Sequence, residues 1–283
     1  MFHRPDSNLF VPDGTPPEAA LARTTLLGIG AHPDDLEFMA LHGILSCFGK
    51  DDAWFGGVTC TDGAGSARSG PYADLGDGEM VRVRAREQDT AASIGGYSFI
   101  ARLGHPSFAA KQAKLRTVLV DDLERLLRAT RPRAVYTHHG MDKHAAHVGV
   151  FCAVLEAARR LDRNERPATV YGCEVWRALD WVSDREKIVH PLDAHPNLAA
   201  ALNGVFDSQI AGGKRYDLAV EGRRRANATF GEPRAVDDCG RAAYAVDLSP
   251  LFRDDEADPA AFFQGFVDRM AAEVRETIAG CRT

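Results

Sequence analysis

Short apolar runs alternate with longer amphipathic segments through most of this chain of 283 residues. The apolar runs have the length of buried strands, and we expect strands at 25–31, 54–60, 97–103, 133–137, 169–175 and 188–192. The intervening segments carry apolar residues at helical spacing, and we expect helices at 36–48, 79–94, 111–129, 144–161, 197–210 and 259–278. Strands that alternate with helices of this length form right-handed βαβ units, which predicts a Rossmann-like α/β fold with a mostly parallel sheet covered on both faces.

The two ends of the chain depart from this pattern. Residues 1–24 hold four prolines and little periodicity, which indicates an extended arm laid over the domain or a frayed tail. After Trp176 the periodicity weakens, but no linker rich in proline or serine separates this part from the rest. We therefore predict an N-terminal arm over 1–24 and a single domain over 25–283, in which 176–283 is an extension.

Composition argues against several classes of protein. The formal net charge of −6 and the absence of a basic stripe make nucleic acid an unexpected partner. No run approaches the roughly 20 apolar residues of a membrane span, so we expect no membrane association. Six cysteines are scattered without a CxxC pair, and no apolar leader opens the chain, a combination that fits reduced thiols and a cytoplasmic location.

Two clusters of ionisable residues follow two of the expected strands. His32-Pro33-Asp34-Asp35 comes after the first strand, and HHGMDKHAAH at 138–147 comes after the fourth. Ligands of open α/β sheets collect outside the carboxyl ends of the strands, and a doubly wound order is compatible with these two strands being neighbours. His32, Asp35 and an imidazole of the second cluster would then form a metal site of two histidines and one carboxylate, with an open position for water.

Other interpretations of these clusters remain open at this point. A dinucleotide-binding fingerprint is rejected, because Pro33 stands at the last glycine position of GxGxxG and the aspartates would repel a pyrophosphate. Asp34 or Asp35 could instead cap the following helix, with His32 as a turn residue. His144 and His147 lie on one helix face, but such pairs are also common on solvated helices, and spacing does not choose between them as ligands.

The sequence resembles a known family. AHPDDLE together with the later DKHAAH resembles the PIG-L/LmbE-like zinc-dependent de-N-acetylases, which carry an AHPDD-E motif after the first strand and an HxxH motif, usually HPDH, after a later one. The resemblance continues through the TDGAGS loop, the RxxE pair Arg84 and Glu87, and the ARLGHP turn. It covers roughly residues 25 to 210.

The resemblance implies roles for six residues. His32, Asp35 and His147 would bind one Zn²⁺ ion per chain, although another divalent ion is also compatible. Asp34 would be the general base, His144 would assist the oxyanion or protonate the amine, and Arg84 would contact the substrate. The chemistry agrees with the composition of the site, because zinc lowers the pKa of a bound water towards ~7 and polarises an acetamide carbonyl.

Two positions depart from the family pattern. The aspartate of HPDH is Ala146 here, so His144 lacks the carboxylate that would hold its tautomer, although Asp142 is near enough in sequence to substitute. An aspartate often found after the third strand aligns with Ser107, which removes a contact to a sugar hydroxyl. The identity of the substrate is therefore more open than the presence of the metal.

We accordingly predict a zinc-dependent hydrolase that removes an acetyl group from an N-acetylated amino sugar, such as an N-acetylglucosamine derivative, or from a glycoconjugate. The alternatives are a metal-dependent hydrolase of another amide or ester, and a metal-dependent binding protein without turnover. Because oligomers are common among the proteins it resembles, a homo-oligomer is compatible with this prediction.

Two segments outside the motifs receive a structural interpretation. The aromatic residues Tyr171, Trp176 and Trp181 could stack on a sugar ring, but side chains in such a segment more often belong to the core. The run Arg223-Arg224-Arg225 is expected on a solvated helix face.

Overall fold

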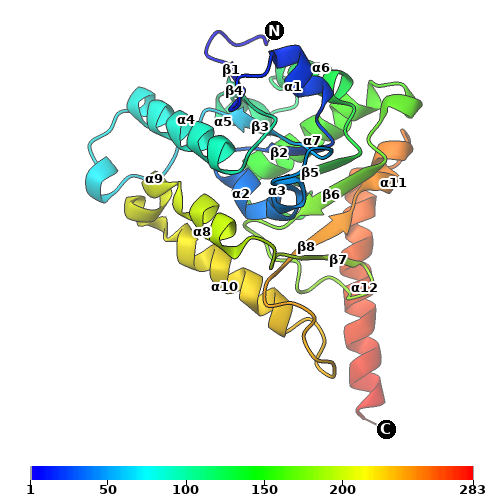
Figure 1. The fold of residues 1–283 in the computed structure, drawn as a ribbon. Coiled ribbons are helices and arrows are strands. Elements are labelled where there is room, and N and C mark those ends of the chain that lie inside the picture. Colours follow the sequence, from blue (N-terminus) through cyan, green and yellow to red (C-terminus); the bar gives the residue numbers. More distant parts are fainter. Residues whose placement is uncertain (1, 283) are drawn as a thin grey trace.

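The computed structural model describes residues 2–282, and an eight-stranded mixed sheet runs through the middle of this part (Figure 1). The strands follow the order β1-β4-β3-β2-β5-β6-β8-β7. They span Asn8–Phe10 (β1), Leu26–Gly30 (β2), Phe55–Thr61 (β3), Phe99–His105 (β4), Ala134–His138 (β5), Thr169–Cys173 (β6), Lys187–Pro191 (β7) and Ala242–Asp247 (β8). Strands β2 to β6 pair in parallel, and the pairings at both edges are antiparallel, which confirms the expected α/β class.

Helices cover both faces of the sheet (Figure 1). The α-helices span Pro17–Ala22 (α1), Asp35–Met39 (α2), Leu41–Cys47 (α3), Asp77–Ile94 (α4), Ser107–Lys111 (α5), Thr117–Thr130 (α6), Ala145–Arg159 (α7), Pro196–Gly204 (α8), Asp207–Gln209 (α9), Tyr216–Thr229 (α10), Ser249–Arg253 (α11) and Pro259–Gly280 (α12). Short 3₁₀ turns lie at Gly70–Tyr72 (η1) and Arg163–Glu165 (η2), and a π-helical turn lies at Ile210–Lys214 (η3). Among the described residues, no helix combines the length and apolarity needed to cross a membrane.

Alternate residues of the strands enter two separate apolar clusters, one on each face of the sheet. Leu27 and Ile29 of β2 pack with helices α1, α6, α7 and α11, whereas Leu26 packs with α2, α3 and α8. Successive side chains of a strand point to opposite faces, so both sides of β2 are buried. A strand buried on both faces is expected to be apolar throughout, which explains why the periodicity of β2 is a continuous run rather than an alternation.

The first and fourth strands expected from the sequence are neighbours in the sheet. They correspond to β2 and β5, and Leu26 to Ile29 pair with Ala134 to Thr137 in parallel register. The chain leaves β2 towards β3 on one side, while β5 lies on the other, so the strand order reverses between them. This reversal is the position where α/β sheets bind ligands, and both histidine clusters follow the strands that border it.

Several elements differ from the expectation. The helix expected over 36–48 is interrupted at Ala40, and the helix expected from residue 111 begins only at Thr117. Residues 1–24 contribute an edge strand and a short helix rather than an extended arm alone. Strand β8 and helix α10 were not anticipated, because the alanine-rich β8 has a weak strand signal and α10 is rich in charged residues. The division into an arm and one domain stays a prediction.

Candidate active site

Two glycines of strand β2, Gly28 and Gly30, make room for the side chains around the site. A Cβ atom on Gly30 would lie 2.9 Å from the Cβ atom of Asp35, and one on Gly28 would lie 2.6 Å from the ring of Phe55. Both positions are in strand β2 rather than in a phosphate-binding turn. These glycines therefore serve close packing of the strand against α2 and β3, in agreement with the rejection of a dinucleotide site.

The turn after β2 aims its two aspartates in different directions. Asp34 has a φ angle of 97°, in the left-handed region, and stands at the N-cap of α2 without making a side-chain cap bond. Its carboxylate lies 2.9 Å from Arg84, whereas Asp35 accepts a 2.7 Å hydrogen bond from the backbone N–H of His32. The hypothesis that Asp34 is a helix cap is therefore wrong, and an unusual backbone angle of this kind is typical of functional sites.

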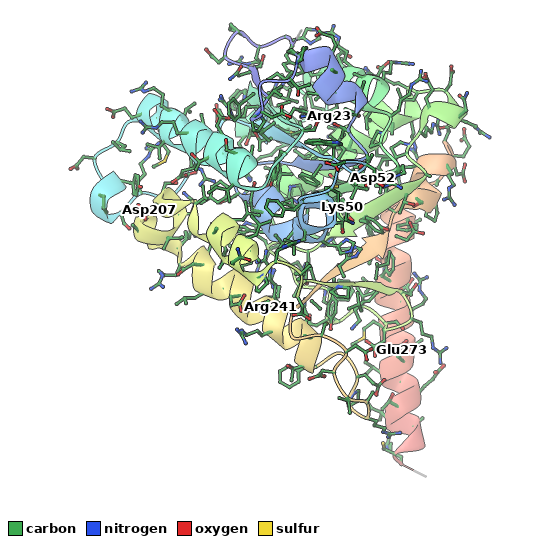
Figure 2. The ribbon with its side chains drawn as sticks, viewed as in Figure 1. Arg23, Lys50, Asp52, Asp207, Arg241 and Glu273 are labelled. Carbon is green, nitrogen blue, oxygen red and sulfur yellow. The ribbon has the colours of Figure 1, made fainter. Side chains whose placement is uncertain are left out.

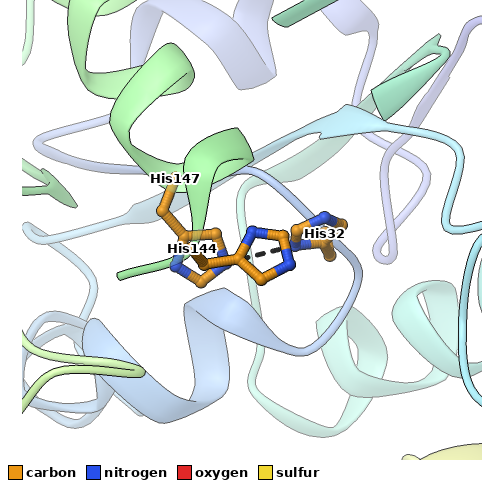
Figure 3. A group of neighbouring side chains, drawn as sticks. All are labelled: His32, His144 and His147. Carbon is orange, nitrogen blue, oxygen red and sulfur yellow. Dashed lines mark hydrogen bonds between the residues drawn. The ribbon is translucent and has the colours of Figure 1, made fainter. Parts of the chain in front are cut away.

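His32, Asp35 and His147 converge on one point. The Nδ1 atom of His32 lies 3.3 Å from a carboxylate oxygen of Asp35, His147 Nε2 lies 3.4 Å from the other oxygen, and the two nitrogens are 3.2 Å apart. Figure 3 shows the imidazoles of His32 and His147 facing each other, with His144 beside them. Zinc bonds of about 2.0–2.2 Å at tetrahedral angles separate ligand atoms by about 3.3–3.6 Å, so this donor set fits one Zn²⁺ ion.

His138 belongs to the same centre, although it received no role in the sequence analysis. Its Nε2 atom accepts a 2.9 Å hydrogen bond from Ala31 N–H and lies 3.2 Å from Asp35, and its ring stacks on His147 at 3.9 Å. Two groups of neighbouring side chains could hold a metal ion: Asp35, His138 and His147 form one, and His32, His144 and His147 form the other. His138 is the last residue of β5, next to the strand that precedes Asp35. This position at the end of an apolar run is the feature of the sequence that could have indicated a role for His138.

Burial and the imidazoles set the charge states of this centre. Burial opposes the ionisation of Asp35, but the neighbouring His147 and His138 outweigh it and hold the pKa of Asp35 well below its usual range. Burial lowers the pKa of His138 to about 4, assisted by the nearby His147. The centre thus combines an anionic carboxylate with an imidazole, His138, that is neutral near pH 7. Burial by itself lowers the pKa of His147, but the neighbouring Asp35 and Asp142 outweigh it and raise that pKa, so a metal ion would have to displace a proton from His147.

Asp142 holds His147 rather than His144. One oxygen of Asp142 lies 3.2 Å from His147 Nδ1, and the other accepts a 3.0 Å bond from the backbone N–H of His144. The hypothesis that Asp142 replaces the missing carboxylate at Ala146 as the partner of the His144 ring is therefore wrong. Its contact with His147 instead places a proton on Nδ1 and leaves the Nε2 lone pair directed towards Asp35 and His32.

Asp142→Asn should lower zinc affinity by about 10–100-fold, because carboxylate partners of metal-binding histidines have effects of this size. The side chain keeps its shape, but it loses the negative charge beside His147. Competition with a zinc chelator measures this affinity directly. Asp121→Asn on α6, where Asp121 pairs with Arg160, is the matched control, and equal affinities in the two variants would contradict the role of Asp142.

His144 lies at the edge of the centre. Its ring meets that of His32 edge-on at 4.9 Å and lies 4.6 Å from that of His147, and its buried Nδ1 atom has no partner among the described residues. Burial, followed by the nearby His147 and His32, lowers the pKa of His144 to about 4. A neutral imidazole with an unpaired nitrogen is suited to hydrogen bonding with a group that enters the site.

Arg84 pairs with the predicted general base. Its side chain is only 1% exposed, and its guanidinium also donates to the carbonyl oxygen of Pro33 and to Ser208 Oγ at 3.2 Å. Burial raises the pKa of Asp34 to about 6, an effect that the Arg84 cation opposes and the Asp35 charge reinforces. The polar contacts of Arg84 are thus with protein groups, and the contact with substrate implied by the resemblance stays a prediction.

Arg84→Gln should lower kcat and shift the acid limb of its pH profile upwards. Asp34 must be ionised to accept a proton, so activity falls as the pH drops through its pKa of about 6, and removal of the opposing cation raises that pKa. The pH dependence of kcat and KM for Arg84→Gln measures both effects, with Arg86→Gln, on the exposed side of α4, as the control. A higher KM with an unchanged kcat and pH profile would instead indicate direct contact with substrate.

A cavity of about 750 Å³ opens over the centre. Asp34, Asp35, His32 and His144 lie in its wall, and aromatic side chains of Phe38, Trp176 and Tyr216 line it further. The ring of Trp176 lies 5.9 Å from that of His144 and 6.0 Å from that of Tyr216. The expectation that Trp176 belongs to the core is therefore wrong, whereas Tyr171 and Trp181 do pack against the apolar clusters.

The arginine run of α10 also contributes to this cavity. Arg224 is 3% exposed and donates a 2.7 Å bond to the backbone oxygen of Glu37, and Arg223 donates to that of Val175. Only Arg225 is on the solvent side of the helix, where it pairs with Glu221. The expectation of a solvated arginine face is wrong for Arg223 and Arg224, because α10 packs across the opening of the site instead of lying free.

The sheet order and the histidine-carboxylate centre at its reversal point define an α/β protein with a candidate metal site. Residues 27–158 match the family model PIG-L, described as GlcNAc-PI de-N-acetylase. A search of curated protein sequences finds no match.

Solved structures share the fold at low sequence identity. The 4-carboxy-2-hydroxymuconate hydratase GalB from Pseudomonas putida aligns with a TM-score of 0.61 and 16% identity over 80% of this chain and 95% of its own. The N,N'-diacetylchitobiose deacetylase from Pyrococcus horikoshii aligns with a TM-score of 0.59 and 14% identity over 82% and 86%. A deacetylase of teicoplanin biosynthesis aligns with a TM-score of 0.56 and 16% identity over 79% and 97%.

Proposed function

We propose that this protein is a metal-dependent hydrolase that removes the acetyl group from an N-acetylated amino sugar or glycoconjugate. The observation that carries the proposal is the convergence of His32, Asp35 and His147, whose ligand atoms lie 3.2–3.4 Å from one another. These distances suit one Zn²⁺ ion, and the carboxylate of Asp34 lines the same cavity. The match to the PIG-L family model and the occurrence of the same fold in two deacetylases support the reaction class.

The residues around the centre supply acid–base chemistry. A zinc ion held by the three ligands would polarise an acyl carbonyl and activate water for attack on it. Asp34 takes the proton of the attacking water, and its pKa of about 6 also allows it to pass that proton to the leaving nitrogen. Arg84 fixes the carboxylate of Asp34 in place, and His144 hydrogen-bonds the oxygen on which negative charge develops.

The fold by itself does not choose the substrate. One protein with this fold is a hydratase and others are deacetylases, so the same fold supports more than one reaction. A hydrolase of another amide or ester, or a binding protein without turnover, are the alternatives to the proposal. The expected cytoplasmic location, homo-oligomer and absence of nucleic acid or membrane partners stay predictions.

Acetate release and metal content together test the proposal. The purified protein, reconstituted with Zn²⁺ and desalted, is incubated with N-acetylglucosamine, N,N'-diacetylchitobiose and phosphorylated or carboxylated N-acetyl sugars, and acetate and bound zinc are measured. We expect close to one zinc ion per chain and acetate release from at least one sugar. Retention of zinc without acetate release would overturn deacetylation, and failure to retain zinc would overturn the ligand assignment.

A further inference from the structure

Lysine residues gather around the opening of the cavity. The chain has six lysines, and three of them, Lys111, Lys143 and Lys214, line this cavity. They come from three separate segments: the end of α5, the loop before α7 and the end of η3. Because these segments are far apart in the sequence, the cluster is produced by the fold and not by a local basic run. A chain of net charge −6 thus places half of its lysines at one opening.

These ammonium groups are not neutralised by the protein. Within residues 2–282, the ammonium groups of Lys111 and Lys143 have neither an ion pair nor a hydrogen bond, and Lys214 lies 5.3 Å over the ring of Trp176. Lys187, which does not line the cavity, instead pairs with Asp184 at 2.5 Å. The three lysines at the cavity therefore present free positive charge to a molecule that enters.

Most acidic side chains in the cavity wall interact with other groups of the protein. Asp34 pairs with Arg84, and Asp35 faces the imidazoles of the centre. Glu174 is 5% exposed and accepts bonds from the backbone N–H groups of Leu179 and Tyr244. Asp62 is the remaining carboxylate in the lining, and one of its oxygens accepts the backbone N–H of Ala64. The opening therefore carries a net positive charge.

The cationic groups lie close to the reacting centre as well as to the aromatic wall. Lys143 precedes His144 in the sequence, and the charge of Lys111 is near enough to contribute to the lowered pKa of His144. The ammonium group of Lys214 lies over the ring of Trp176, and the centre of this ring is 5.9 Å from that of the His144 ring. A sugar ring against Trp176 would thus have its acetamide at the metal ligands and its other substituents beside three ammonium groups.

We propose that the substrate carries an anionic group, a phosphate or a carboxylate, which Lys111, Lys143 and Lys214 bind while the N-acetyl group lies at the metal centre. This inference rests on the proposed deacetylation and narrows its substrate class. An ammonium is a compact charge with three donors, and several around one anion compensate it without demanding a fixed bidentate geometry. Attraction of this kind weakens as salt is added.

The kinetic test compares sugars that differ in charge. For the wild type we expect kcat/KM to be at least about 10-fold higher for N-acetylglucosamine 1-phosphate, N-acetylglucosamine 6-phosphate or N-acetylmuramic acid than for neutral N-acetylglucosamine, and the preference to shrink between about 0.05 and 0.5 M salt. A preference for the phosphates or for the carboxylate identifies the anionic group.

The variants test whether the three lysines cause this preference. In the triple variant K111Q/K143Q/K214Q, the ratio of kcat/KM for anionic to neutral sugars should be near one. Lys50→Gln, after α3 and outside the cavity lining (labelled in Figure 2), should keep the wild-type ratio. Equal kcat/KM values for neutral and anionic sugars, or a preference that survives in the triple variant, would overturn the inference.

A binding measurement separates this inference from the proposed reaction. Trp176 lines the cavity, so quenching of tryptophan fluorescence by the same sugars reports occupancy without turnover, and Trp176→Phe identifies its share of the signal. If no sugar releases acetate, the proposed function fails, but tighter binding of the anionic sugars that the triple variant loses would still support an anion-binding opening. Binding that is insensitive to the charge of the sugar, to salt and to the triple substitution would overturn the inference.

Discussion

Asp34→Asn should leave the zinc content near the wild-type value and lower kcat by about 10²–10⁴-fold, the usual contribution of a positioned general base. Asparagine keeps the shape of the side chain and tolerates the left-handed backbone angle of 97° found here, but it cannot accept a proton. The three predicted zinc ligands are untouched. Zinc analysis and acetate release on one preparation measure both quantities.

The control for this experiment must separate chemistry from folding. Asp34→Asn also removes the anionic partner of the buried Arg84, so the thermal unfolding of the variant is compared with that of wild type and of Asp52→Asn, an exposed substitution. Normal turnover in a folded Asp34→Asn protein would show that Asp34 is not the base. Loss of zinc from Asp34→Asn together with its retention by Asp35→Asn would show that the roles of the two aspartates are exchanged.

His147→Ala should lose both the metal ion and activity, whereas His144→Ala should keep the ion and lose turnover. His147 Nε2 lies 3.2 Å from His32 Nδ1 and 3.4 Å from Asp35, so its removal opens one third of the predicted ligand set. The ring of His144 contacts this set from the side, and no carboxylate among the described residues holds its Nδ1. Zinc bound per chain after desalting, with acetate release, distinguishes the two variants.

His138 allows a sharper form of this comparison. Because Asp35, His138 and His147 are one of the two groups that could hold a metal ion, the ion could be held by His138 in place of His32. His32→Ala and His138→Ala are therefore measured beside His147→Ala, and His32→Ala should release the ion while His138→Ala retains it. Retention of zinc in His147→Ala would contradict both ligand sets, since His147 belongs to each of them.

The candidate site could be predicted from the sequence because its ionisable residues lie at the ends of strands. His32, Asp35 and His147 follow two apolar runs, and a doubly wound order is compatible with those runs being adjacent, as β2 and β5 are. The parts that could not be predicted depend on side-chain direction. Asp142 is five residues from His147 and two from His144, and only the course of the loop decides that its carboxylate meets the ring of His147.

The residues that form the cavity wall could not be predicted from the sequence either. Helix α10, which was not anticipated, brings Tyr216 and Arg224 to the opening, and Trp176 joins them from the loop after β6. A run of three arginines predicts a solvent-exposed helix face unless the helix is known to pack across the site. Elements that follow the regular βαβ pattern were accessible to periodicity, whereas the segments that shape the substrate pocket were determined by tertiary packing.

The pairing of β2 with β5 has a consequence for the folding of the chain. His32 and His147 are 115 positions apart, and only closure of the parallel sheet brings their nitrogens within 3.2 Å. An unfolded chain therefore offers an ion single, scattered side chains, and the free energy of coordination accrues almost entirely to the native state. At a free ion concentration about a thousand times the dissociation constant, this linkage amounts to about 4 kcal/mol, a large share of the 5–15 kcal/mol that stabilises an ordinary domain. The centre that we assign to catalysis would thus also stabilise the native contact between the two halves of the sheet.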